Sequence, residues 1–148
     1  MISVDTNILV YAIDQRDPVK QSVAQAVLKA LAQTETVVAL QVVGEFQHAL
    51  KRHLKLPSWA AAQAARNLLA QFGSFAYDRT AVETALAQSS AGRLSYWDAL
   101  LLAAADAVGV TTLLSEDLAD GSVHGGVEIV NPFAQDGPSP RIRSLITP

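Results

Sequence analysis

Four acidic residues, Asp5, Glu45, Asp98 and Asp117, occupy positions where a side chain can be held for chemistry. Asp5 ends a short apolar run that starts at Ile2, and Asp117 follows another apolar run by three residues. Both runs are typical of buried strands. Glu45 and Asp98 have apolar neighbours at helical spacing, so we expect each to lie on the inward face of a helix.

Each acid also has an ordinary structural interpretation. Asp5 or Thr6 can cap a helix that starts directly after the first strand. The stretch from Ser95 to Asp98 fits a capping box, with Asp in the usual Glu position. Glu45 can extend to the surface or pair with a buried arginine. These interpretations stay open for the individual residues.

The elements that would position these acids alternate between strand and helix. Helical spacing and capping signals predict helices over 18–31, 41–54, 59–72, 79–90 and 98–108, and β-rich runs predict strands over 2–4, 36–40, 74–77, 110–114 and 127–130. Such alternation indicates an α/β fold with a mainly parallel sheet. We expect one domain over residues 1–133 and a Pro-rich tail over 134–148 without regular structure, in which Ile142, Leu145 and Ile146 can still pack on the domain.

In a parallel sheet, the strand ends at Asp5, Gln41 and Ser115 would lie along one edge. Acids gathered there repel one another unless a cation neutralises them. Ligands that are all oxygen atoms suit Mg²⁺ or Mn²⁺ better than zinc or copper. Carboxylates that hold such an ion beside a phosphodiester support metal-assisted hydrolysis.

Composition narrows the function classes. The 148 residues include no cysteine, which excludes disulfides, zinc–thiolate sites and thiol nucleophiles. No apolar run reaches the roughly 18–20 residues that span a membrane, so we expect a cytoplasmic protein with no membrane partner. The net charge of −3 gives no general attraction to nucleic acid. RNA binding would therefore rely on bound cations or on local basic residues, for which the candidates are Lys51, Arg52, Lys55 and Arg79.

Two tryptophans, Trp59 and Trp97, are aromatic residues that can either pack internally or stack on nucleic-acid bases. We expect both to be packing residues. The expectation is weaker for Trp97, because it adjoins Asp98.

Four short motifs together resemble the PIN-domain ribonucleases, and among them the VapC-type toxins of bacterial toxin–antitoxin modules. The motifs are Val4-Asp5-Thr6-Asn7-Ile8-Leu9-Val10, Val43-Gly44-Glu45-Phe46, Tyr96-Trp97-Asp98-Ala99-Leu100-Leu101 and Leu114-Ser115-Glu116-Asp117-Leu118. Each motif is weak by itself, and their order and spacing make the match specific. The resemblance extends from Met1 to about Pro132 and does not include the tail.

The resemblance implies a five-stranded parallel sheet flanked by helices and an endoribonuclease that depends on Mg²⁺ or Mn²⁺. It implies that Asp5, Glu45 and Asp98 are metal ligands, that Asp117 supports the same site, and that Thr6, Asn7 and Ser115 orient these groups. It also implies a homodimer and an antitoxin protein as partner. The alternative is a PIN-like module that binds RNA or protein without cleaving it.

Overall fold

The computed structural model describes residues 1–146, and its centre is a mainly parallel sheet. The strands are β1 (Ile2–Val4), β2 (Val37–Ala39), β3 (Gly73–Phe75), β4 (Thr112–Leu114), β5 (Val123–His124) and β6 (Val127–Val130). Strands β1, β4 and β6 pair in parallel, and β5 adds an antiparallel edge. The parallel pair β2–β3 joins β1 through one bridge between Ile2 and Thr36. The five expected strands are therefore present, with the order β3-β2-β1-β4-β6.

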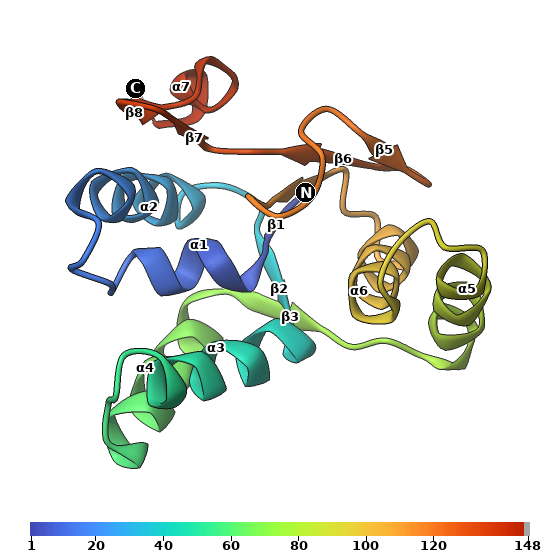
Figure 1. The fold of residues 1–148 in the computed structure, drawn as a ribbon, viewed down its shortest axis with the longest axis horizontal. Helices are drawn as coiled ribbons and strands as arrows, with labels where there is room; N and C mark the ends of the chain where they lie inside the picture. Colours follow the sequence, from blue (N-terminus) through green and yellow to red (C-terminus); the bar gives the residue numbers. More distant parts are fainter. Residues whose placement is uncertain (147–148) are drawn as a thin grey trace.

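Seven helices surround this sheet within residues 1–146. They are α1 (Thr6–Tyr11), α2 (Pro18–Leu31), α3 (Leu40–Arg52), α4 (Ser58–Gln71), α5 (Arg79–Ser90), α6 (Tyr96–Ala107) and α7 (Pro140–Ile146). Helices α5 and α6 pack together on one side of the sheet, whereas α1 to α4 lie on the other (Figure 1). None of these helices is long and apolar enough to cross a membrane.

Local sequence accounts for where the helices begin. Asp17 and Asp78 accept hydrogen bonds from the backbone of Lys20 and Ala81, and each thereby caps its helix. Pro18 stands in the first turn of α2, where the missing N–H is no loss. The expected helices are all present, and their ends differ from the predicted ones by at most two residues.

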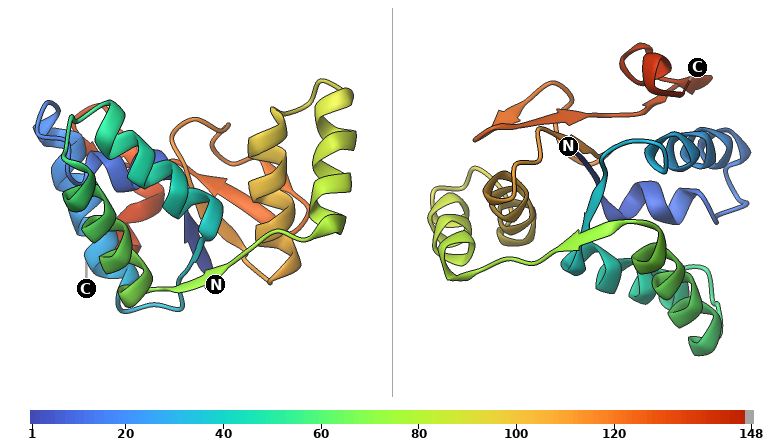
Figure 2. Two further views of the ribbon diagram at one scale, coloured as in Figure 1. Left: turned by 90° about the horizontal axis from the view of Figure 1, so that it is seen from below. Right: turned by 180° about the vertical axis from the view of Figure 1, so that it is seen from behind.

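The strands bring three chain segments to one edge of the sheet. Strands β1, β2 and β4 run in the same direction, so their carboxyl ends lie together. The start of α1 follows β1 directly, α3 follows β2 directly, and the segment that begins at Ser115 follows β4. The view from behind shows α1 and α3 on one side of these strands and α6 on the other (Figure 2). This edge is where the fold places the candidate residues.

The C-terminal tail is more ordered than its proline content predicted. Strands β7 (Phe133–Ala134) and β8 (Gly137–Pro138) form a small hairpin, and α7 packs beside α2. The expectation of no regular structure was therefore wrong over most of the tail. Proline is tolerated here because Pro140 occupies the first position of α7, where no backbone donor is required.

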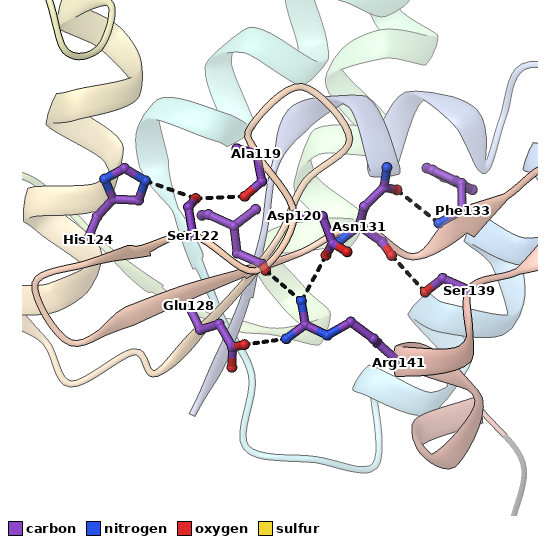
Figure 3. Close-up of polar contacts among 10 residues, drawn as sticks. Ala119, Asp120, Ser122, His124, Glu128, Asn131, Phe133, Ser139 and Arg141 are labelled. Carbon is purple, nitrogen blue, oxygen red and sulfur yellow. Dashed lines mark hydrogen bonds and ion pairs between the residues drawn. The ribbon is translucent and has the colours of Figure 1, made fainter.

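Two contacts anchor the tail on the domain. Ile142 is buried in the core, which confirms that this residue packs on the domain. The Arg141 guanidinium donates to Asp120 Oδ1 at 2.9 Å and to the Ile129 carbonyl at 3.3 Å, and it also binds Glu128 (Figure 3). The tail therefore fastens β6 to the segment that follows β4.

Candidate active site

Asp5 lies at the carboxyl end of β1 and is 8 % exposed. Its backbone N–H continues the sheet ladder by donating to the Leu114 carbonyl at 2.9 Å. Its two carboxylate oxygens have separate donors, the Thr6 N–H at 2.7 Å and the Ser115 hydroxyl at 2.8 Å. Asp5 is thus both the N-cap of α1 and a strand-end carboxylate, so the two interpretations of this residue are compatible.

Burial raises the pKa of the Asp5 carboxyl above its ordinary value. The hydrogen bonds from Ser115 and Thr6 act in the opposite direction, and the negative charges of Asp98 and Glu45 add to the increase. Removal of the carboxylate from water is therefore the largest of these effects. A cation beside Asp5 would relieve both the desolvation and the repulsion.

Glu45 projects from α3 and is exposed, whereas Val42 and Phe46 on the same helix are buried. The expectation that Glu45 lies on the inward face was wrong, because polar partners hold it at the edge of that face. Thr6 Oγ1 donates to Glu45 Oε2 at 2.7 Å, and Gln41 Nε2 donates to Glu45 Oε1 at 3.0 Å. Both carboxylate oxygens are thereby oriented.

Asp98 lies in the first turn of α6 and is half-buried. Ser95 caps this helix, because its hydroxyl oxygen accepts from the Asp98 N–H at 3.2 Å. Within residues 1–146, the Ser95 N–H donates no hydrogen bond to the Asp98 carboxylate, so half of the expected capping box is formed. The Asp98 carboxylate is instead close enough to Asp5 to raise the pKa of Asp5.

Asp117 lies beyond β4 and is exposed. Asn7 Nδ2 donates to Asp117 Oδ2 at 2.9 Å, and Asn7 Oδ1 accepts from the Glu116 N–H at 3.4 Å. A second set of contacts holds Glu116, which accepts from the Tyr11 hydroxyl at 3.0 Å and pairs with Lys20 at 2.8 Å. Helices α1 and α2 therefore fix the segment that carries Asp117.

The four acids come from four segments that meet at one edge of the sheet. The side chains of the residues expected to orient them, Thr6, Asn7 and Ser115, each donate a hydrogen bond to one acid. Sequence reasoning missed Gln41 as a site residue. Its side-chain N–H₂ links Glu45 to the Trp97 carbonyl at 3.2 Å and so joins α3 to the start of α6. The signal was its position one turn before Glu45 on the same helix face.

The donor chemistry of this edge fits a hard cation. Within residues 1–146, no Lys, Arg or His side chain forms an ion pair with Asp5, Glu45 or Asp98. In that same part of the chain, no three acidic, histidine or cysteine side chains are gathered closely enough to hold a metal ion as they stand. The available ligands are carboxylate oxygens, which Mg²⁺ and Mn²⁺ prefer, and Mg²⁺ commonly keeps several of its waters.

The candidate RNA-binding residues are not gathered at this edge. Lys51 and Arg52 lie in the last turn of α3, and from Glu45 to Lys51 the helix advances by roughly 9 Å at 1.5 Å per residue. Lys55 follows in a turn, with a positive φ of 57°. Arg79 is the first residue of α5 and is exposed. Arg79 differs from the other three, which lie at or beyond the end of α3, because it begins the helix that follows β3.

The expectation that both tryptophans are packing residues was wrong. Trp59 is 75 % exposed at the start of α4, and Trp97 is 58 % exposed at the start of α6. Trp97 lies beside the acids, whereas Trp59 belongs to a different helix on the other side of the sheet.

Three solved structures share this fold at low sequence identity. The toxin VapC20 of Mycobacterium tuberculosis, described as cleaving the sarcin–ricin loop, has a TM-score of 0.60 at 20% identity, over 76% of this chain and 87% of that chain. A toxin–antitoxin complex from Klebsiella pneumoniae has a TM-score of 0.64 at 22% identity, over 90% of this chain and 98% of that chain. VapBC2 of Rickettsia felis, bound to a fragment of promoter DNA, has a TM-score of 0.55 at 20% identity, over 78% and 87%.

None of the curated proteins matches this chain in sequence. The comparison with protein families does give a match, to the PIN domain over residues 2–119. That range includes β1 to β4 and the four acids. The family match and the shared fold agree, and this chain belongs to the PIN-domain family.

Proposed function

We propose that this chain is a metal-dependent endoribonuclease and the toxin of a type II toxin–antitoxin pair. The observation that carries the proposal is the buried Asp5 carboxylate, whose pKa is raised and which has Glu45 and Asp98 as negatively charged neighbours. Keeping such charges together without a cation is unfavourable, and a cation bound between them would offset both their repulsion and the cost of burial.

The residues that would hold the ion are Asp5, Glu45 and Asp98, with Asp117 as a further ligand or as support for a second ion. When bound, Mg²⁺ or Mn²⁺ supplies Lewis-acid chemistry, which lowers the pKa of a water molecule and stabilises charge on phosphate oxygens. The choice of these two metals rests on the all-oxygen donors of the edge.

The chain itself would orient these acids through neutral donors. Ser115 and the Thr6 N–H hold the Asp5 carboxylate, while the Thr6 hydroxyl and Gln41 hold Glu45. Asn7 holds Asp117 in the same way. Neutral donors orient a carboxylate without cancelling its charge, so the acids keep their affinity for a cation.

The RNA would be held mainly outside the acidic edge, by cations that contact phosphates. Lys51, Arg52, Lys55 and Arg79 are the candidates, and their charge counters the overall balance of −3. Lys51 and Arg52 would contact phosphates some distance from the cleaved bond, because they lie at the far end of α3.

The proposed partners are an antitoxin protein and a second copy of this chain. Relatives of the same fold have been solved as a toxin–antitoxin complex and as VapBC2 with promoter DNA. An enzyme that cleaves RNA and is restrained by an antitoxin would act in the cytoplasm.

A second candidate function is a PIN-like module that binds RNA or protein without cleavage. It is favoured by one observation, that the acids of residues 1–146 are not gathered as a compact metal-binding group. Titration with Mn²⁺ followed by calorimetry separates the two functions. Saturable binding that is lost in Asp98→Asn supports the nuclease, and an absence of binding supports the module.

Expression in a bacterial host tests the toxin proposal directly. The parent protein should arrest growth, and Glu45→Gln should restore it, because the amide keeps the shape of the side chain but removes a ligand charge. Glu83→Gln is the matched control, an exposed glutamate on α5, and it should remain toxic. Growth arrest that persists in Glu45→Gln would contradict the proposal.

A further inference from the structure

An open groove of about 430 Å³ adjoins the acidic edge. It is lined by Leu40, Gln41, Gly44, Glu45, Tyr77 and Trp97. Three of these are large apolar or aromatic side chains that remain exposed: Leu40 at 46 %, Tyr77 at 47 % and Trp97 at 58 %. Because Glu45 lines the groove and also belongs to the acid set, anything in the groove lies next to the proposed reaction centre.

Trp97 is exposed and yet held in position. Its ring packs edge-on against Tyr96, with the ring centroids 5.0 Å apart and the planes at 74°. Its backbone carbonyl accepts a hydrogen bond from Gln41 at 3.2 Å. The hydrogen bond fixes the main chain at Trp97, and the Tyr96 contact restricts its ring, so the ring loses less freedom when a second flat group stacks on it.

Gly44 leaves space in the same groove. Apart from its chain neighbours and the adjacent backbone of α3, a Cβ atom placed on Gly44 would meet no heavy atom within 4 Å. Glycine in the middle of a helix is unfavourable relative to alanine by roughly 0.5–1 kcal/mol. The stability of α3 therefore does not require glycine here, and the space beside it is open to a group from outside the chain.

We propose that this groove receives an unpaired nucleobase of the RNA, next to the phosphodiester that is cleaved, with Trp97 and Tyr77 as its aromatic contacts. The proposal rests on the proposed function, since it places the RNA beside the acids. The flat face of a nucleobase stacks on an aromatic side chain. A base can stack in this way only when it is unpaired, so the RNA at the cleavage site would be single-stranded.

The charges beside the groove favour RNA over a protein as the occupant. A second copy or a protein partner that brings no cation to this edge would bury Glu45 next to Asp5 and Asp98, and removing unpaired charges from water is costly. A nucleotide avoids this cost because its phosphate and the proposed cation reach the acids together. The size of the groove lies within the roughly 300–1,000 Å³ of ordinary ligand pockets.

Binding of a short single-stranded RNA that contains the fluorescent base 2-aminopurine tests the proposal. The assay uses the Asp5→Asn background in Mg²⁺, so that the RNA stays intact. Stacking on Trp97 should quench the fluorescence, and Trp97→Ala should weaken binding by about 5- to 150-fold, as expected for one stacked base. Trp97→Phe should retain most of the affinity, because it keeps an aromatic face.

Two further variants separate the groove from general effects. Trp59→Ala removes an even more exposed tryptophan outside the groove and should bind like the parent. Gly44→Leu should block binding by filling the groove while α3 remains stable. Equal affinity in the Trp97→Ala variant would overturn the proposal, and so would an absence of quenching both in Asp5→Asn and, on mixing in Mg²⁺, in the parent protein.

Sedimentation, RNA binding and RNA cleavage, measured on the same variants, distinguish the other occupants of the groove from RNA and separate the groove proposal from the proposed function. If Trp97→Ala changes the oligomeric state and leaves RNA affinity unchanged, the groove is a contact between copies and the proposal is wrong. If the parent binds and quenches the RNA but does not cleave it, the groove proposal stands and the proposed nuclease function fails. If the parent cleaves RNA and Trp97→Ala cleaves equally well at limiting RNA, only the groove proposal fails.

Discussion

Replacing Asp5 by Asn separates a metal ligand from an ordinary helix cap. Asn and Asp are about equally good N-caps, and Asn Oδ1 can still accept from the Thr6 N–H. The Asn side-chain N–H₂ can donate to Ser115, whose hydroxyl is able to accept as well as donate. The change therefore removes one charge and keeps both hydrogen bonds.

The sign of the effect follows from the raised pKa of Asp5. Above both pKa values, the folded state carries an ionised carboxylate that it holds less favourably than the unfolded chain does. Each unit by which folding raises the pKa lowers the free energy of unfolding by about 1.4 kcal/mol at neutral pH. The penalty grows as the pH rises from 3.8 through the folded pKa, and below 3.8 it vanishes because Asp5 is protonated in both states.

Melting curves in EDTA measure this penalty. At pH 7, Asp5→Asn should melt higher than the parent, by roughly 3–6 °C for each pKa unit in a domain of this size. Addition of Mn²⁺ should then reverse the order. A hundredfold excess over Kd stabilises the parent by about 2.7 kcal/mol, or roughly 5–11 °C, and should stabilise Asp5→Asn much less.

Two results would refute this reasoning. If Asp5→Asn melts below the parent in EDTA at pH 7, the ionised carboxylate is stabilising and acts as an ordinary cap. If the variant also keeps the full Mn²⁺ shift, Asp5 is not a ligand. The gap between the two proteins must also close as the pH falls toward 4, and a constant gap would point to altered packing.

Three further predictions concern residues outside the candidate active site. Ser3→Ala should raise the free energy of unfolding by about 1 kcal/mol in denaturant titrations, because the buried Ser3 hydroxyl has no hydrogen-bond partner within residues 1–146. Arg16 lowers the pKa of Asp14 to about 2, so Asp14→Asn should be less stable than the parent above pH 4, and acid titration should show that gap closing as the pH falls through about 2. Ile142→Ala should cost about 2–5 kcal/mol by the same denaturant titrations if the tail is part of the core, and a loss below 1 kcal/mol would contradict that.

The fold was largely predictable because its signals are local. The spacing of apolar residues predicts which segments are buried. Examples are the short β-branched run Ile2–Val4 and the amphipathic stretch from Val23 to Leu31. Their alternation then restricts the topology to a parallel sheet with helices on both sides. The motifs predicted each acid as a candidate site residue from its position after a strand or within a helix.

The remaining features depend on contacts that sequence spacing does not encode. Glu45 has apolar neighbours at helical spacing, yet Thr6 and Gln41 hold it at the exposed edge. The order of the tail depends on the contacts of Arg141 with residues that precede it by 12 to 21 positions. Trp97 is a large aromatic residue at the start of an apolar helix, and such a position predicts burial from sequence alone. It is exposed because it borders the open groove that Gly44 also lines.

The most direct test of the central claim is cleavage of a single-stranded RNA by the purified parent protein and by Asp5→Asn, each in Mg²⁺, in Mn²⁺ and in EDTA. We predict that the parent cleaves in either metal and stops in EDTA. Asp5→Asn should be inactive in all three conditions while its circular dichroism matches that of the parent. Cleavage that continues in EDTA, or an Asp5→Asn variant as active as the parent, would contradict a metal-dependent site at this edge of the sheet.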